Sequence, residues 1–378
     1  MYEINPRLGG FQCIRCGTRF PVAAYSAGCP LCFAADYPAS VAPVYEGAQP
    51  PPRSGVRGMA RFADRLPYRT FPSLGEGDTP LIELPTLARE LGIERLLVKF
   101  EGAQITGSHK DRMSAQFIAH ACALGAPRVI AASSGNAGVS IAAYAAQARM
   151  PCTIVTNTGM QTPWRQALES IGADLVECPD SLSRWQFVRE KVETAGWLSA
   201  TNYLDPPVGS DPSGVDAYKT IAYELGEDPG FSGIDAVLIP TARGDVLWGL
   251  FAGFREMQTA GEIKRSPALI AVEPFARLNR VLAGEDYRGH FDGASMLASI
   301  GGVTTTLQSL LAVRETQGTA ITVSESNARQ DQVVLARNGV YLEDSSAAAL
   351  SALRSLARRD TRVRQAILIG TSHGYKSS

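Results

Sequence analysis

The chain has 378 residues, of which 45% are hydrophobic and 19% charged, with a formal net charge of -1. A chain of this length exceeds what one hydrophobic core usually serves, so two or three domains are expected. The nearly balanced charge gives no support for a nucleic-acid or membrane partner, and no apolar run is long enough to span a bilayer. The N-terminal "MYEINPRLGGFQC" lacks the basic and apolar regions of a secretory signal, which predicts a cytoplasmic protein.

The first 32 residues contain two C-x-x-C pairs separated by twelve residues. Two such pairs can hold a tetrahedral zinc ion, and four thiolates leave no position open for a substrate. We therefore predict a structural zinc site in a zinc-ribbon-like segment; the alternative is unligated or redox-active cysteines. The predicted ligands are Cys13, Cys16, Cys29 and Cys32. The remaining cysteines are expected to be buried small hydrophobes, namely Cys122, Cys152 and Cys178.

A Pro/Gly-rich linker over residues 45–55 precedes an alternation of short apolar runs and longer helical patterns. Strands are predicted over residues 95–100, 128–133, 152–157, 173–178, 197–202, 235–240, 268–273 and 366–370. Helices are predicted over residues 111–125, 139–150, 163–172, 181–196, 215–226, 247–261, 326–339 and 346–360. Continuously apolar strands that alternate with helices indicate an α/β protein with doubly wound, mainly parallel sheets covered on both faces.

Four strand-to-helix junctions carry small polar residues, where ligands bind in such folds. They are Thr106–Asp111, Ser133–Gly138, Thr241–Val246 and Thr371–Gly374. We expect all four to lie on the same edge of a parallel sheet and to form one active site.

Each junction suggests a kind of contact. "SSGNAG" is suited to cradle a carboxylate or a phosphate, although an ordinary helix cap is the alternative. Its members are Ser133, Ser134, Gly135, Asn136, Ala137 and Gly138. "TARGDV" pairs backbone amides with an arginine and suits a phosphate, although Arg243 could simply be solvated. The hydroxyl of Thr371 can meet a weakly basic ring nitrogen.

Seven stretches occur in an order that is specific to one family. They are "GEGDTPL", "EGAQITGSHKDR", "SSGNAGVSIAAYAA", "YKTIAYEL", "IPTARGDVLWGLFAGF", "LEDSSAAALSAL" and "LIGTSHGYK". As an ordered set they resemble pyridoxal-phosphate enzymes of the tryptophan-synthase β fold, fold type II. The likeness is closest to threonine synthase and its relatives, including cysteate synthase, and covers residues from Gly75 to Lys376. The N-terminal segment is similar to one that some threonine-synthase-like proteins carry.

The resemblance implies pyridoxal 5'-phosphate as the cofactor and a role for each matching residue. Lys110 would bind the cofactor covalently and act as the base for the substrate's Cα proton. A helix start and partial burial favour the uncharged amine that this role requires. Asn136 would hold the pyridoxal 3'-oxygen, and the whole Ser133–Gly138 stretch would wrap the substrate carboxylate. Thr371 would bond the pyridine nitrogen.

The implied phosphate cradle consists of Ala242, Arg243, Gly244, Asp245 and Val246. Relatives usually have more glycine at this point. The chain also departs from the family's phrase before the lysine, with Gln104-Ile105 in place of Asn-Pro and His109 in place of Phe. We expect His109 and His120 to have packing roles, and His373 to be a candidate contact of the cofactor ring; His290 carries no signal.

The implied domains are a zinc-ribbon-like segment, a linker leading into a large pyridoxal-phosphate domain, a small domain, and the rest of the large domain. Their expected limits are residues 1–45, 46–110, 111–200 and 201–378. A homodimer is expected for this fold and size.

Three functions compete. The first is a threonine-synthase-type lyase that converts O-phospho-L-homoserine and water to L-threonine and phosphate. Its small, phosphorylated amino-acid substrate needs a second anion site, for which Arg165, Lys219 and Arg243 are candidates. The second is β-replacement or β-elimination on O-phosphoserine, serine, threonine or diaminopropionate, as in cysteate synthases, ammonia-lyases and dehydratases. The third is a non-catalytic binding protein that kept the fold.

Overall fold

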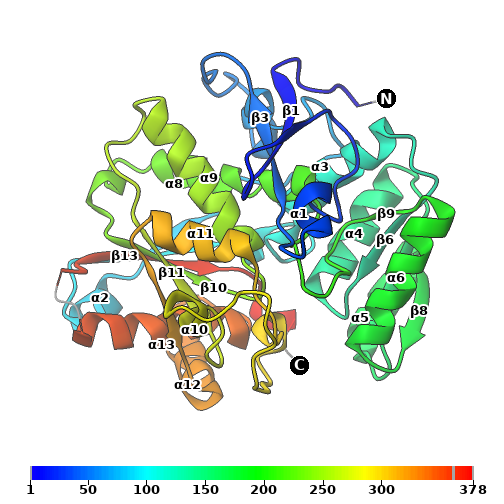
Figure 1. Cartoon of the computed structure of the whole chain (residues 1–378). Helices are drawn as coiled ribbons and strands as arrows, with labels where there is room; N and C mark the ends of the chain where they lie inside the picture. The colour runs from blue at the N-terminus through cyan, green and yellow to red at the C-terminus, as the bar shows by residue number, and fades with distance from the viewer. Residues whose placement is uncertain (1, 360–361, 377–378) are drawn as a thin grey trace. The chain divides into compact units, whose positions relative to one another are not determined.

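The computed structural model of the protein describes residues 2–359 and 362–376 (Figure 1). Its internal contacts divide the chain into two compact units. The first unit contains residues 2–77 and 110–218, and the second contains residues 78–109 and the described residues from 219 onward. The predicted domain limits stay a prediction.

The N-terminal part of the first unit is a small antiparallel sheet with the strand order β2-β1-β3. Its strands are β1 (Leu8–Cys13), β2 (Arg19–Phe20) and β3 (Val41–Tyr45). The short helix α1 (Pro30–Ala34) lies between β2 and β3 in the chain, and the 3-10 helix η1 (Met59–Arg65) follows. This sheet brings the two cysteine pairs together.

The rest of the first unit is built on a four-stranded parallel sheet with the order β8-β7-β6-β9. The strands are β6 (Val129–Ala132), β7 (Cys152–Asn157), β8 (Asp174–Cys178) and β9 (Leu198–Ser199). The helices are α3 (Lys110–Ala123), α4 (Asn136–Gln147), α5 (Thr162–Ile171), α6 (Ser181–Ala195) and α7 (Pro212–Asp216). Side chains of β6, β7 and α6 form an apolar core that includes Ile130, Val155 and Trp185.

The second unit is built on a six-stranded sheet with the order β12-β11-β10-β13-β5-β4, in which only β4 runs antiparallel to its neighbour. The strands are β4 (Leu81–Glu83), β5 (Arg95–Phe100), β10 (Ala236–Pro240), β11 (Ala268–Glu273), β12 (Thr319–Thr322) and β13 (Gln365–Gly370). The helices are α2 (Pro85–Leu91), α8 (Lys219–Gly226), α9 (Asp245–Thr259), α10 (Leu278–Leu282), α11 (Leu307–Glu315), α12 (Glu325–Arg337) and α13 (Asp344–Arg359). The 3-10 helices of this unit are η2 (Glu101–Ala103), η3 (Phe231–Gly233), η4 (Ala298–Ile300) and η5 (Gly374–Lys376).

Helices cover both faces of this sheet, with α2, α12 and α13 on one side and α8, α9 and α11 on the other (Figure 1). The apolar strand residues therefore have no solvent-facing side, which explains their continuous hydrophobic runs. The predicted α/β class with two doubly wound, mainly parallel sheets is confirmed.

One sequence expectation about elements needs correction, and one extends beyond the described residues. The helix predicted over residues 215–226 is two helices, because α7 ends at Asp216 and α8 begins at Lys219. The helix predicted over residues 346–360 corresponds to α13, although its last residue, Asp360, lies outside the described residues.

The expectation that four junctions share one sheet edge is wrong. The junctions after β5, β10 and β13 belong to neighbouring strands of the six-stranded sheet, whereas Ser133–Gly138 follows β6 of the four-stranded sheet. An alternating pattern of strands and helices does not predict which sheet each strand joins. Within the described part of the chain, β6 pairs with β7 and β9 alone, so its carboxyl end belongs to the first unit.

Candidate functional site

Lys110 is the first residue of α3 in the first unit, and its side chain is half-buried. Its Nζ lies 5.7 Å from the centre of the Tyr218 ring, which is fully buried. The next residue, Asp111, accepts a hydrogen bond from Ser140 Oγ at 2.7 Å and ties the start of α3 to α4. The lysine therefore lies at a fixed helix start beside a buried aromatic ring.

The Ser133–Gly138 stretch links β6 to α4 as a tight turn. The Ser133 hydroxyl accepts hydrogen bonds from the backbone N–H groups of Gly138 at 2.9 Å and Gly135 at 3.3 Å. Asn136 begins the helix, and Asn136 and Ala137 are both half-buried. The start of a helix offers backbone N–H groups that can bind an anion such as a carboxylate.

A further cation lies beside this turn. Ser134 Oγ accepts hydrogen bonds from Thr156 Oγ1 at 2.9 Å and from Arg184 Nη1 at 3.1 Å. Arg184 stands on the first turn of α6, directly after β8, so it belongs to the carboxyl edge of the same four-stranded sheet. Sequence reasoning missed Arg184, although the junction after β8 follows the same rule that selected the others.

Two of the three cations proposed from the sequence for a substrate phosphate already have carboxylate partners. Arg165 forms an ion pair with Glu177. Lys219 is completely buried, and its Nζ lies 3.0 Å from Glu256 Oε1. The carboxylate in each pair weakens the attraction of its cation for a ligand phosphate.

In the second unit, the Ala242–Val246 stretch connects β10 to α9. Gly244 has a left-handed φ of 81°, and a Cβ at this position would lie 2.3 Å from Ser309 Cβ, so only glycine fits. Thr306 Oγ1 donates to the Arg243 carbonyl oxygen at 2.6 Å, and Gln308 Nε2 donates to Asp245 Oδ1 at 2.6 Å. The start of α11 thus holds the start of α9 in place.

Two arginine side chains, those of Arg243 and Arg277, lie near Gly302 and the Ala242–Val246 stretch. A Cβ on Gly302 would lie 3.4 Å from Arg243 Nη1, and Arg277 donates to the Gly302 carbonyl and to Thr241 O. Burial lowers the pKa of both guanidinium groups, that of Arg277 to about 10, with Glu273 opposing the shift at Arg277 and Asp245 at Arg243. Two buried guanidinium groups at this end of the sheet would attract an anion.

Thr371 directly follows β13, and both of its oxygens are held in place. The N–H and Nδ1 of His109 each lie 3.0 Å from the Thr371 carbonyl oxygen. A carbonyl only accepts, so Nδ1 of His109 carries a proton. Thr371 Oγ1 lies 2.6 Å from Ser346 Oγ on the first turn of α13. Because His109 precedes Lys110 in the chain, the residue before the lysine anchors to the end of β13.

The remaining histidines have distinct surroundings. His120 is fully buried with its Nδ1 2.8 Å from Tyr68 Oη, and burial lowers its pKa, as a packing role requires. The His373 ring stacks on Tyr375 with centres 4.6 Å apart, and its Nδ1 accepts from the Tyr375 N–H at 3.2 Å. His290 is exposed in a loop.

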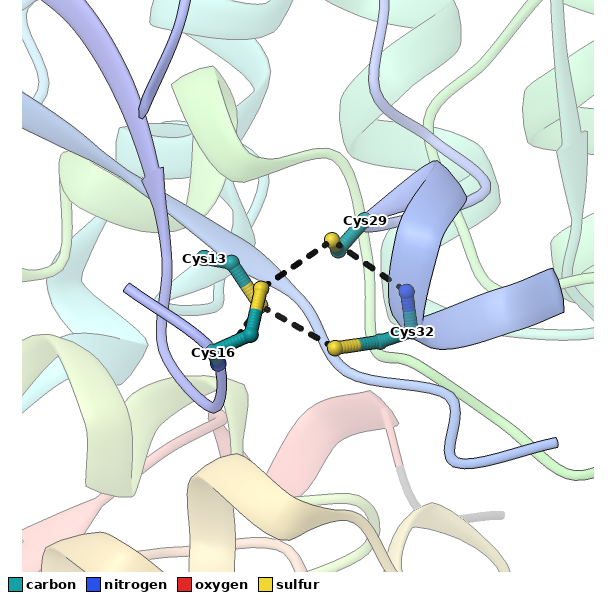
Figure 2. Close-up of side chains that lie close together, drawn as sticks. All are labelled: Cys13, Cys16, Cys29 and Cys32. Atoms are coloured by element: carbon teal, nitrogen blue, oxygen red, sulfur yellow. Dashed lines mark hydrogen bonds between the residues drawn. The ribbon is translucent and has the colours of Figure 1, made fainter. Parts of the chain in front are cut away.

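The four N-terminal cysteines form a compact cluster (Figure 2). Their sulfurs all lie within 4.8 Å of one another, with Cys13 to Cys32 at 3.6 Å and Cys16 to Cys29 at 3.8 Å. A zinc ion with four Zn–S bonds of about 2.3 Å places sulfurs about 3.8 Å apart, far beyond the ~2.05 Å of a disulfide. The cluster therefore fits a tetrahedral metal ion.

Of the other cysteines, Cys152 and Cys178 are buried as expected, whereas Cys122 is only half-buried. The structure places all three outside the four-cysteine cluster.

Comparisons with known proteins identify a matching family and similar proteins. Residues 72–370 match the family of pyridoxal-phosphate dependent enzymes. The chain is 27% identical over 336 residues to the threonine synthase of Methanocaldococcus jannaschii, covering 84% of this chain and 80% of that protein. It is 28% identical over 308 residues to the threonine synthase of Methanosarcina acetivorans, covering 78% of this chain and 74% of that protein.

Among solved structures, the fold is similar to that of serine racemase from Dictyostelium discoideum, with a TM-score of 0.65 and 20% identity. The match covers 78% of this chain and 92% of that one. At this identity the likeness concerns the fold alone, which is the one expected from the ordered motifs.

The chain belongs to the family of pyridoxal-phosphate dependent enzymes. The predicted resemblance to threonine synthases is confirmed, and so is the predicted class, a pyridoxal-phosphate dependent lyase of fold type II.

Proposed function

We propose that the protein is a threonine-synthase-type lyase that converts O-phospho-L-homoserine and water to L-threonine and phosphate. The observation that carries this proposal is Arg184, which donates to Ser134 Oγ at 3.1 Å inside the stretch assigned to the substrate. A phosphorylated substrate is stabilised by a cation that can bind its phosphate, and Arg184 is a cation beside this stretch. The name threonine synthase in both of these relatives supports the same reaction.

In this proposal Lys110 binds the cofactor and its Nζ accepts the proton from the substrate's Cα. The cofactor, when bound, supplies an electron sink that stabilises the negative charge left at that carbon. Asn136 holds the pyridoxal 3'-oxygen, and the backbone of Ser133–Gly138 orients the substrate carboxylate. Thr371 hydrogen-bonds the ring nitrogen.

We assign the cofactor phosphate to the start of α9, at Ala242–Val246. The Gly244 conformation, which brings the loop against α11, supports this assignment, and so does the positive end of a fifteen-residue helix. Arg243 adds a formal charge that a glycine-rich loop lacks. We therefore place Arg243 with the cofactor phosphate and Arg184 with the substrate phosphate.

We propose that the metal at the four cysteines is zinc with a structural role. The S···S distances of 3.6 and 3.8 Å support a tetrahedral thiolate site. The remaining proposals concern the assembly and the compartment. A homodimer in the cytoplasm is what we expect for this fold; among the described residues, no helix has the length and hydropathy to cross a membrane.

The experiment that tests the reaction is a substrate panel. The purified, cofactor-loaded protein is incubated with O-phospho-L-homoserine, O-phospho-L-serine, L-serine, L-threonine and diaminopropionate, and inorganic phosphate, L-threonine and 2-oxo acids are measured. We expect phosphate and L-threonine in equal amounts from O-phospho-L-homoserine alone. Turnover of only the three-carbon substrates or of threonine would replace this proposal with β-replacement or β-elimination. No turnover by a protein that binds no cofactor would favour a non-catalytic binding protein.

A further inference from the structure

The first turn of α13 contacts the residue that follows β13 through two hydroxyl groups. Ser346 Oγ lies 2.6 Å from Thr371 Oγ1 and accepts a hydrogen bond from the backbone N–H of Ser372 at 3.1 Å. Ser346 is completely buried, and Thr371 is 6% exposed. The geometry is rigid because His109 holds the Thr371 carbonyl with two hydrogen bonds.

The direction of the hydroxyl–hydroxyl bond follows from the donors and acceptors available. The Ser372 amide can only donate, so it occupies one lone pair of Ser346 Oγ. Among the described residues, Thr371 Oγ1 is the one other polar atom bonded to Ser346 Oγ. If Thr371 donated to Ser346, the Ser346 proton would be buried without an acceptor, which costs free energy. Ser346 therefore donates its proton to Thr371 Oγ1.

This direction leaves the Thr371 proton for a ligand. No other protein group in the described part of the chain bonds Thr371 Oγ1. A ligand that presents a lone pair satisfies the Thr371 proton, whereas a ligand that presents an N–H leaves that proton without an acceptor.

We propose that Ser346 is a positioning residue that makes the Thr371 hydroxyl a hydrogen-bond donor toward the cofactor's ring nitrogen and so keeps that nitrogen unprotonated. This inference rests on the proposed function, because it takes Thr371 as the partner of the ring nitrogen. A neutral ring nitrogen withdraws electrons less strongly than a protonated one, which suits elimination and replacement better than transfer of the amino group.

The test is nitrogen-15 NMR of the protein loaded with pyridoxal phosphate labelled at the ring nitrogen. In the wild-type protein we expect the chemical shift of an unprotonated nitrogen. In Ser346→Ala the Thr371 hydroxyl is released to accept as well as donate, and the shift moves toward the protonated value. The ratio of protonated to unprotonated nitrogen rises roughly fivefold, the effect of one buried hydrogen bond.

The matched control is Ser351→Ala. Ser351 is also a buried serine of α13, but its hydroxyl donates to Asp331 Oδ2 at 2.6 Å, on α12. Loss of a buried hydroxyl from this helix destabilises both variants, so only the Ser346 change should move the nitrogen signal. Ser346→Thr keeps the hydroxyl and should keep the wild-type signal.

The possible results distinguish a failure of the Ser346 role from a failure of the proposed function. A protein that takes up the cofactor but shows the same nitrogen shift in wild type and Ser346→Ala overturns the role of Ser346 and leaves the proposed function intact. A protonated nitrogen in the wild type overturns it as well, even if Ser346→Ala fails to fold. A protein that takes up no cofactor overturns both the proposed function and this inference.

Discussion

Arg184 is the residue on which substrate choice depends in this account. Its guanidinium donates to Ser134, beside the turn assigned to the substrate carboxylate. We expect Arg184→Gln to raise KM for O-phospho-L-homoserine roughly tenfold to a hundredfold, the effect of losing one hydrogen bond to a charged group. Steady-state kinetics with varied substrate measure this change.

Arg189→Gln is the control, because Arg189 lies on the same helix but pairs with Glu193 at the surface. It should leave KM within about twofold of the wild type. An unchanged KM in Arg184→Gln would assign the substrate phosphate to a different cation.

At the same scale, Asp64 stabilises the N-terminal part of the first unit. Hydrogen bonds from Arg53 first, and also from Arg69, lower the pKa of its carboxyl from 3.8 to about 2. A lowered pKa stabilises the folded state above the unfolded-state value, and this contribution disappears as the pH falls from about 4 to about 2. Asp64→Asn should therefore reduce the free energy of unfolding by about 1 kcal/mol near neutral pH and by less in acid.

Urea unfolding at several pH values checks this. Asp174→Asn is the comparison, because Asp174 also pairs with an arginine but its side chain is 66% exposed. It should cost less than about 0.5 kcal/mol. A cost for Asp64→Asn that stays constant with pH would show that the carboxyl charge is not responsible.

At the scale of elements, the contact between the starts of α9 and α11 shapes the proposed phosphate cradle. Gly244→Ala combines a left-handed φ of 81° with a Cβ 2.3 Å from Ser309 Cβ. We expect a loss of stability of roughly 2–4 kcal/mol, because the backbone conformation and the overlap both cost free energy. The cofactor affinity, measured by titration into the apoprotein, should fall as well.

Gly261→Ala separates the effect of the left-handed backbone conformation from the effect of the contact with Ser309. Gly261 lies just after the end of the same helix, has a similar φ of 75°, and has open space where its Cβ would be. It should cost about 1 kcal/mol and leave cofactor affinity unchanged. Equal effects of the two substitutions on cofactor affinity would place the phosphate elsewhere.

The N-terminal sheet is the second element whose role can be tested. Its Phe11 ring contacts the ring of His120 on α3, the helix that begins with Lys110, with centres 6.4 Å apart. If the four cysteines hold zinc, elemental analysis should find about one ion per chain, and a strong chelator should lower the Tm. Cys16→Ser should lose the metal, whereas Cys178→Ser should retain it.

Absence of zinc from protein purified under reducing conditions, together with a Tm that neither zinc nor chelator changes, would contradict a structural metal site.

At the scale of the whole molecule, the main architecture could be predicted because buried parallel strands have continuous apolar runs, such as "AVLIP" in β10. The N-terminal sheet could not, since β1 contains two adjacent glycines and a bulge between Leu8 and Gly10. The helix α11 was also missed, although Thr306 and Ser309 form a capping box at its start.

The candidate site was partly predictable for a similar reason. Residues within one strand-to-helix junction are close in sequence, so the Ser133–Gly138 and Ala242–Val246 stretches could be recognised. Pairs distant in the chain could not be matched, because Ser134 meets Arg184 and Thr371 meets Ser346 only after the sheets have formed. The sequence also did not indicate which sheet each strand joins, which explains the wrong expectation of a single shared edge.

The measurement that tests the central claim most directly is the absorption spectrum of the purified protein, compared with that of Lys110→Ala after both have been incubated with pyridoxal phosphate and desalted. We predict a visible cofactor band in the wild type that is absent from the variant, because Lys110 provides the amine that binds the cofactor. A wild-type protein without any band, or a variant with the same band, would contradict the account.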